Sequence, residues 1–182
     1  KIKLNSKYIY SEGLLENLCM AIKISLDLKI NKKIIKKTIP KIKFEGRVQY
    51  LNKGKIKKKI NKNEKIILDG AHSQIAAKNL AKYLKTVRGP KYAIWGMIKN
   101  KEPFEFIKQF RGIFKEVVTV PANNKKNSIP NYSLMDYAKK NKFKVCPANN
   151  VEQAIKKISN DKQKTIVILG SLYLVGSVLS SI

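Results

Sequence analysis

Arginine, histidine and cysteine are scarce in this chain of 182 residues, and each scarcity narrows the kinds of site to expect. The cysteines stand only at Cys19 and Cys146, without CxxC or Cys/His spacing, so neither a disulfide framework nor a zinc site is expected. No apolar run approaches the roughly 20 residues that cross a bilayer. The first residues also lack a signal-peptide pattern. These absences favour a cytoplasmic protein that does not contact a membrane.

Basic residues are abundant, yet nearly all of them are lysines. Lys and Arg number 39 against 12 acidic residues, which gives a formal net charge of +27. Arginine, the side chain suited to bidentate recognition of bases and phosphates, occurs only at positions 47, 88 and 111. The lysines accompany many Ile and Asn residues, which A/T-rich codons encode, so genome composition explains the charge better than nucleic-acid binding. A basic α/β module that binds RNA or other polyanions stays the alternative.

The chain begins at Lys1, not at Met, within an alternating pattern. We therefore expect the C-terminal portion of a longer protein, although a trimmed chain would begin in the same way. Ser11 to Leu28 has apolar residues at helical spacing with Ser11 as N-cap, and a second helix is predicted from Asn31 to just before Pro40.

The pattern changes after residue 43. Residues 46–60 predict a hairpin or strand pair that turns at residues 52–54. Apolar strand-like runs then alternate with helical patterns. The strands are expected at 65–69, 92–97, 116–120, 143–146 and 165–170, and the helices at 75–84, 103–110, 132–140, 151–158 and 172–179. Such alternation predicts an α/β fold, a Rossmann-like and mainly parallel sheet with helices on both faces.

In such a sheet, ligands bind beyond the C-terminal ends of the strands, so residues directly after strands are the candidates for function. Asp69 and His72, the only histidine, follow the strand at 65–69. By position alone this DGAH turn reads more simply as a capped helix start, with Asp69 or Ser73 as N-cap. A strand-end carboxylate could instead orient a hydroxyl or a metal-bound water, and His72 could bind an anionic substrate.

Three other parts of the sequence also offer side chains that could bind an anion. Ser171 follows Gly170 at the last strand and offers a hydroxyl at a helix N-terminus, where a carboxylate or phosphate can bind. Lys99 and Lys101 lie in the loop before the helix at Pro103, and either could bind an anion. Arg47 is one of the rare arginines and could hold a phosphate or form an ordinary surface salt bridge.

Taken in order and spacing, the segments EGRVQYL, LDGAHSQIAAKNL, WGMIKNKEP and LGSLYLVGSVL resemble the C-terminal domain of folylpolyglutamate synthase/dihydrofolate synthase, in the Mur ligase superfamily. The resemblance covers residues 44–182. It implies a Mur ligase-type C-terminal domain over 44–182. Residues 1–43 then correspond to the helical C-terminal remnant of the central ATPase domain.

The resemblance implies an ATP- and Mg²⁺-dependent amide ligase that adds L-glutamate to dihydropteroate or folate through an acyl phosphate. By the same resemblance Arg47 and Asp69 contact ATP, His72, Ser171 and Lys101 contact substrate, and the protein is a monomer. A related ligase acting on a cell-wall precursor stays open as a further alternative.

The chain departs from the family pattern in informative ways. Glu45 stands where the family usually has proline before Gly-Arg, and Ser73 stands where it has asparagine. No GxxxxGK[ST] loop is present in these residues, so the phosphate-binding loop and the magnesium ligands are expected upstream. We therefore predict that this chain alone is inactive and holds no metal ligand or catalytic residue of its own.

Overall fold

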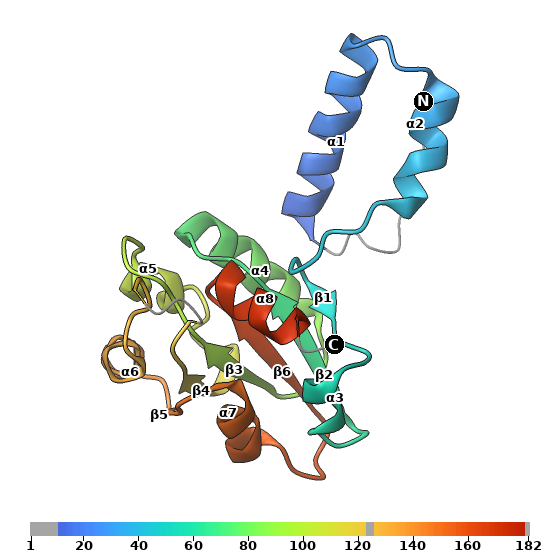
Figure 1. The fold of residues 1–182 in the computed structure, drawn as a ribbon. Coiled ribbons are helices and arrows are strands. Elements are labelled where there is room, and N and C mark those ends of the chain that lie inside the picture. The colour runs from blue at the N-terminus through green and yellow to red at the C-terminus, as the bar shows by residue number, and fades with distance from the viewer. Residues whose placement is uncertain (1–10, 123–125, 181–182) are drawn as a thin grey trace. The chain divides into compact units, whose positions relative to one another are not determined.

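The computed structural model describes residues 11–122 and 126–180, and the chain divides into two compact units, Lys1–Glu45 and Gly46–Ile182 (Figure 1). In the first unit, helix α1 (Glu12–Asp27) is followed by α2 (Lys32–Thr38) and a 3₁₀ turn, η1 (Ile39–Lys41). Ser11 caps α1 by accepting from the Leu14 N–H at 3.4 Å, and Asn31 caps α2. Both predicted helices are therefore confirmed.

The first unit has a very small core. Its apolar cluster is made of the buried residues Leu18, Ile35 and Ile39, and Leu14 is buried as well. Large apolar side chains of the same unit stay exposed to solvent: Leu15, Met20, Ile24, Leu28, Ile30 and Ile34. Two short helices cannot bury apolar stripes on more than their facing sides, so much of this surface is left without a covering layer.

The second unit is built on a six-stranded sheet of order β1-β2-β6-β3-β4-β5. The strands are β1 (Gln49–Tyr50), β2 (Glu64–Asp69), β3 (Lys91–Trp95), β4 (Phe114–Thr119), β5 (Val145–Pro147) and β6 (Lys164–Leu169). Strands β2 to β6 pair in parallel, and β1 pairs antiparallel with β2. The helices are α3 (Lys55–Lys58), α4 (Gln74–Thr86), α5 (Pro103–Lys108), α6 (Asn131–Lys140), α7 (Val151–Ile158) and α8 (Leu172–Leu179).

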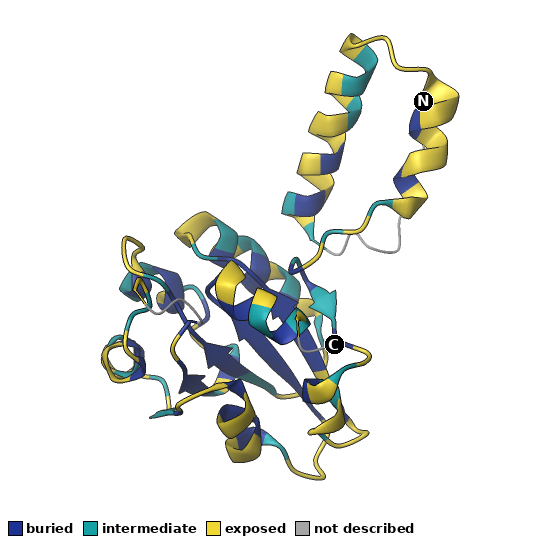
Figure 2. Cartoon of the chain, in the orientation of Figure 1, coloured by how far each residue is buried: buried dark blue, intermediate teal, exposed yellow. Residues whose placement is uncertain are grey.

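Two apolar clusters cover the two faces of this sheet. Helices α4, α5 and α6 pack with alternate strand residues such as Ile67, Ala93 and Val167. Helices α3, α7 and α8 pack with the strand residues that point the other way, such as Ile66 and Ile94. The connections from β2 to β5 run toward one edge of the sheet, and the connection from β5 to β6 runs back. Because all crossovers are right-handed, the helices of the two directions lie on opposite faces. Figure 2 shows the resulting buried sheet between partly exposed helices.

The predicted α/β sheet and its five strand–helix alternations are confirmed, but the hairpin over residues 46–60 is wrong. Only β1 is a strand there, and it pairs with β2, with Gln49 opposite Leu68. The expected second arm is the short helix α3, which buries Ile56 against the sheet and leaves Lys55 and Lys58 exposed. Lysine and isoleucine occur in both strands and helices, so the packing of Ile56 against the sheet decides in favour of a helix here. No helix in the described residues is long and apolar enough to cross a membrane.

A buried ion pair joins the starts of β2 and β6. The Glu64 and Lys164 side chains are 0% and 2% exposed, with Nζ 3.4 Å from Oε1. Glu64 also accepts from the Ser159 hydroxyl at 2.5 Å and from the N–H groups of Asn61 and Asn160. Burial alone would raise the pKa of Glu64, but these hydrogen bonds and Lys164 hold its pKa below the ordinary value.

We predict that Glu64→Gln lowers the free energy of unfolding by about 3 kcal/mol at neutral pH, because it leaves the Lys164 ammonium buried without its counter-charge. Urea unfolding measures the change. Because the folded-state pKa of Glu64 lies below its ordinary value, the ionised carboxylate stabilises the fold at pH values above the ordinary pKa. This stability is lost as the pH falls through the folded-state pKa. The gap between the two proteins should therefore narrow below pH 4.5, the ordinary value for this group.

Glu152→Gln is the matched control, because Glu152 pairs with Lys59 at 2.9 Å on the exposed surface. It should leave stability nearly unchanged, since exposed pairs contribute little. Equal effects of the two substitutions would contradict the role given to Glu64.

Candidate functional site

The candidate site lies at the C-terminal edge of the parallel strands. Asp69 ends β2, Gly170 and Ser171 follow β6, and β6 lies between β2 and β3 in the sheet. The chain leaves β2 through α4 on one face and leaves β6 through α8 on the other. Open α/β sheets bind ligands beyond the strand ends at such a divergence.

The Asp69 carboxylate holds the two loops of this edge together. Its Oδ2 accepts from the Val48 N–H at 2.8 Å, and its Oδ1 accepts from the Ala71 N–H at 2.7 Å. The Gly70 N–H donates in turn to the Gly46 carbonyl at 2.7 Å. Asp69 is therefore not the N-cap of α4; Ser73 has that position and accepts from the Ala76 N–H at 3.3 Å.

Asp69 is almost completely buried, with 4% of its surface exposed. Burial raises the pKa of Asp69 above its ordinary value, while the hydrogen bonds from Val48 and Ala71 and the charges of Arg47 and His72 oppose that rise. Val48, which donates one of these bonds, has φ of +44°, a rare conformation for a β-branched residue. Such backbone persists only where neighbouring interactions hold it, and the Asp69 bond is one of them.

Arg47 lies beside this carboxylate and reaches toward solvent. Its Nη1 is 4.0 Å from Asp69 Oδ1, and 35% of its side chain is exposed. The pair thus leaves guanidinium N–H groups available, so Arg47 can bind a phosphate or carboxylate with two parallel hydrogen bonds. Of the two residues expected to contact ATP, Arg47 is the accessible one, and Asp69 lies behind it.

His72 follows on the same turn and is partly buried. Its Nδ1 is 2.8 Å from the Gly70 carbonyl. A carbonyl oxygen only accepts, so Nδ1 carries the proton, and Nε2 is the nitrogen left for another partner. The turn thereby orients the imidazole.

Ser171 and Lys101, the other expected substrate contacts, differ in their surroundings. Ser171 is buried and caps α8, where its Oγ accepts from the Tyr173 N–H at 3.2 Å. That bond uses one lone pair, so the hydroxyl proton stays able to donate. Lys101 is exposed in the loop between β3 and α5, and within the described ranges it forms no hydrogen bond or ion pair with the other four residues. The structure thus brings Arg47, Asp69 and His72 together, places Ser171 at the next strand end, and leaves Lys101 without a bond to any of them.

Two glycines let the backbone segments of this edge approach closely. A Cβ at Gly70 would collide with the Leu172 side chain and would lie 3.5 Å from Arg47 Nη1. Gly170 has φ of +104°, and a Cβ there would be 2.5 Å from the Gly96 carbonyl and 2.6 Å from the Trp95 ring. A larger residue at Gly170 would push the loops apart, whereas one at Gly70 would displace the Leu172 side chain.

Sequence reasoning missed two contributors to this edge. Gly96 follows β3 as Gly170 follows β6, and this shared position after a strand was the signal available. Val48 contributes its backbone N–H to Asp69 and has a positive φ, and no pattern of residues in the sequence predicts either feature. Among the described residues there is no group of three or more His, Cys, Asp or Glu side chains that could hold a metal ion.

The arrangement suits binding of an anion. An accessible guanidinium and a helix N-terminus with a hydroxyl share one edge of the sheet, while the Asp69 carboxylate is buried and bonded behind them. Phosphate and carboxylate groups bind to such sets of donors.

Comparison with known proteins identifies relatives of this domain. Residues 52–181 match the family described as dihydrofolate synthetase, C-terminal domain. The folylpolyglutamate synthase of Thermotoga maritima is 26% identical and has a TM-score of 0.71, and the match covers 93% of this chain and 38% of that one. Comparison with curated protein sequences yields no match.

Two further structures share the fold at lower identity. Mycobacterium tuberculosis folylpolyglutamate synthase, complexed with ADP and AMPPCP, is 16% identical with a TM-score of 0.79 over 94% of this chain and 40% of its own. The bifunctional folylpolyglutamate synthase/dihydrofolate synthase of Yersinia pestis, complexed with AMPPNP and Mn ion, is 20% identical with a TM-score of 0.70 over 88% and 37%. The chain thus spans at most 40% of the length of these three structures.

We predict that Asp69→Asn lowers the free energy of unfolding by about 1–3 kcal/mol, because an amide has one acceptor oxygen and leaves one buried N–H unpaired. Thermal or urea unfolding measures it. Asp161→Asn, at an exposed aspartate, is the control and should change little. If the two variants are equally stable, Asp69 does not hold the loops.

We also predict that Gly170→Ala destabilises the chain by about 1–3 kcal/mol, through overpacking and a strained φ. Gly176→Ala provides the contrast, because no atom lies within 4 Å of a Cβ there and Gly176 is inside α8. That substitution should stabilise by about 0.5–1 kcal/mol. A stabilising Gly170→Ala would show that the strand ends are not closely packed.

Proposed function

Because the chain belongs to the family of dihydrofolate synthetase C-terminal domains, we propose that it is the C-terminal part of an ATP-dependent amide ligase that adds L-glutamate to dihydropteroate or folate. In this reaction a carboxylate oxygen of the pteroate or folate attacks the terminal phosphorus of ATP, and ADP leaves. The glutamate amine attacks the resulting acyl phosphate, loses a proton and expels phosphate, which leaves an amide.

The observation that carries this proposal is the accessible Arg47 guanidinium held beside buried Asp69 at the C-terminal edge of the sheet. Transfer of a phosphoryl group spreads negative charge over its oxygens, and a fixed guanidinium stabilises that charge. We assign Arg47 to the ATP phosphates. Asp69 belongs to the same nucleotide site and acts through the loop geometry that it imposes on Arg47.

His72, Ser171 and Lys101 are assigned to the substrate side. The His72 Nε2 and the Ser171 hydroxyl are the groups left free by their local hydrogen bonds. Nε2 can accept from an amine, and the hydroxyl can donate to a carboxylate. Lys101 is an exposed cation on the loop after β3, where an anionic substrate group can reach it. When bound, ATP and Mg²⁺ supply the transferred phosphoryl group and neutralise its charge, with the magnesium ligands outside this chain.

The ATPase half of the enzyme is assigned to sequence upstream of this chain, and residues 1–43 to its C-terminal remnant. The exposed apolar side chains of α1 and α2 support this assignment, because they need a further layer to cover them. On this assignment the chain by itself neither hydrolyses ATP nor forms the amide.

The strand-end edge of the sheet also exposes large apolar side chains at the first turns of three helices. These are Ile75 on α4, Tyr132 on α6 and Leu172 with Tyr173 on α8. An edge that combines exposed apolar groups with Arg47 suits closure against the ATPase half, which would exclude water during phosphoryl transfer. The enzyme is proposed to act in the cytoplasm as a monomer.

The test is an assay of the gene product that contains this chain, following ATP-dependent addition of glutamate to dihydropteroate and to tetrahydrofolate. We predict that Arg47→Gln lowers kcat/KM by about 100-fold, as loss of one donor to developing charge does elsewhere. Arg88→Gln is the matched control, since Arg88 is exposed in the loop before β3, at the opposite end of the strands.

No glutamate addition to either acceptor by the unmodified protein would overturn the proposed function. Full activity in the Arg47→Gln protein would overturn only the role of Arg47. Addition of an amino acid to a cell-wall precursor instead would assign the enzyme to the related ligases.

A further inference from the structure

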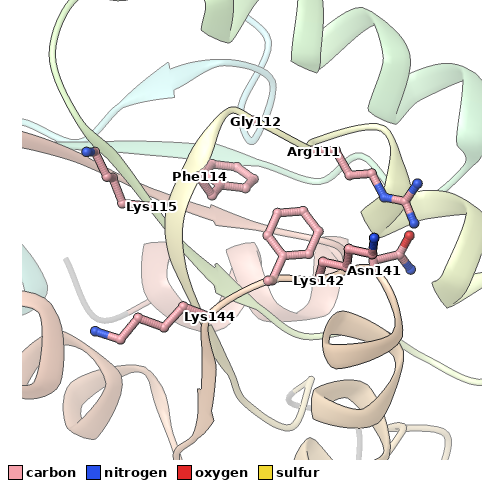
Figure 3. A pocket seen from close by; sticks show the side chains of 8 residues that line it. Arg111, Gly112, Phe114, Lys115, Asn141, Lys142 and Lys144 are labelled. Carbon is pink, nitrogen blue, oxygen red and sulfur yellow. The ribbon is translucent and has the colours of Figure 1, made fainter.

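A second hollow lies at the other edge of the sheet, away from the candidate site. It has a volume of about 530 Å³ and lies between the loop that enters β4 and the loop that enters β5. The lining residues are Arg111, Gly112, Phe114, Lys115, Asn141, Lys142, Phe143 and Lys144 (Figure 3). Because parallel strands begin at this edge, the hollow is separated from Arg47 and Asp69 by the length of the strands.

The hollow is strongly basic. Four of its eight lining residues are cations and none is acidic. Lys144 forms an ion pair with Glu116 at 2.9 Å, and the pair raises the pKa of Lys144. In the described parts of the chain, Arg111, Lys115 and Lys142 have no ion pair. An anion held here would meet three positive charges that no carboxylate neutralises, and Arg111 offers a bidentate contact.

Two aromatic residues and a buried asparagine line the hollow beside its cations. Phe114 packs on Phe110 with ring centroids 5.2 Å apart, and Phe143 lies partly buried on the opposite loop. Asn141 is 2% exposed and donates from Nδ2 to the Tyr137 carbonyl at 3.0 Å, while its Oδ1 is buried and accepts no hydrogen bond from the described residues. In Figure 3 the Arg111 and Lys142 side chains lie at the Asn141 end, and the Lys115 and Lys144 amines lie at the other.

Lys142 has a backbone conformation that a lysine rarely adopts. Its φ is +63°, and it directly follows Asn141, the C-cap of α6, at the position where helices usually place glycine. Its N–H donates to the Lys139 carbonyl at 2.8 Å, so the turn itself needs no side chain. The turn therefore accommodates a charged side chain at the hollow where glycine would be less strained.

We propose that this hollow binds an organic phosphate with a flat apolar body, that is, a nucleotide, with Arg111 and Lys142 on the phosphate and Phe143 against the base. The volume is within the range of small-molecule sites, which is far more than inorganic phosphate needs. Nucleotides combine the two features that the lining combines, an anionic group and an aromatic surface.

The experiment titrates the chain with adenosine 5′-monophosphate and follows backbone amide resonances by NMR. Residues 111–115 and 141–144 should shift and saturate, and adenosine and inorganic phosphate should each bind about tenfold more weakly, because each lacks half of the contacts. Arg111→Gln and Lys142→Gly should weaken binding of the monophosphate about tenfold. Lys142→Gly should not lower thermal stability, which separates loss of binding from loss of folding.

Arg88→Gln and Lys78→Gln are the matched controls, since both residues are exposed and neither lines the hollow. Equal weakening by the controls and by the pocket variants, or inorganic phosphate binding as tightly as the monophosphate, would overturn the proposal. Arg47→Gln should leave these shifts intact, so the test is independent of the proposed ligase activity.

The nucleotide could be a free monophosphate or part of single-stranded RNA, and an oligonucleotide of eight riboadenylates distinguishes the two. Tighter binding of the octamer than of the monophosphate, lost in Arg111→Gln, would assign the hollow to single-stranded RNA. Equal or weaker binding of the octamer would assign it to free nucleotides. Octamer binding that ignores Arg111 and Lys142 would show only general attraction to the lysine-rich surface, and would contradict a defined site.

Discussion

The hydrogen bonds of the Asp69 carboxylate are the constraint on which the candidate site depends. One carboxylate accepts from Val48 on the loop before β1 and from Ala71 on the turn after β2, and so fixes two loops against each other. Arg47 lies on the first loop and His72 on the second. Their positions follow from a single buried group, which is costly to bury and is stable there because two N–H donors and a guanidinium surround it.

The Glu64–Lys164 pair and the Arg47–Asp69 pair use charge in opposite ways. At the start of the strands, Glu64 and Lys164 form a buried pair whose bonds are all satisfied within the fold, which is a structural use. At the strand ends, Arg47 keeps part of its guanidinium in solvent although its partner is buried. A charge that is only half satisfied by the protein is available to a ligand, and this difference separates the candidate site from the structural pair.

The net charge of this protein does not indicate where a ligand binds, whereas the positions of its few arginines do. Lysine accounts for most of the +27 formal charge and covers exposed surface on almost every helix. Arg47 and Arg111 instead lie at opposite edges of one sheet, the first beside a buried carboxylate and the second at a hollow without acidic residues. A fixed geometry around a planar cation selects ligands in a way that scattered ammonium groups do not.

The sequence by itself determined the strand–helix alternation, the helix cap at Ser11, the start of a second helix near Asn31 and the strand-end positions of Asp69 and Ser171, because periodicity and capping are local. Local pattern did not determine helix α3, where burial of Ile56 overrides a strand-like stretch, nor the choice of Ser73 over Asp69 as the cap of α4. Only the tertiary structure decided that Asp69 is buried behind Arg47, that Val48 takes a positive φ and that a basic hollow forms between two distant loops. Each of these depends on segments that meet only when the sheet assembles, since a hydrogen bond between residues 48 and 69 has no counterpart in the order of residues along the chain.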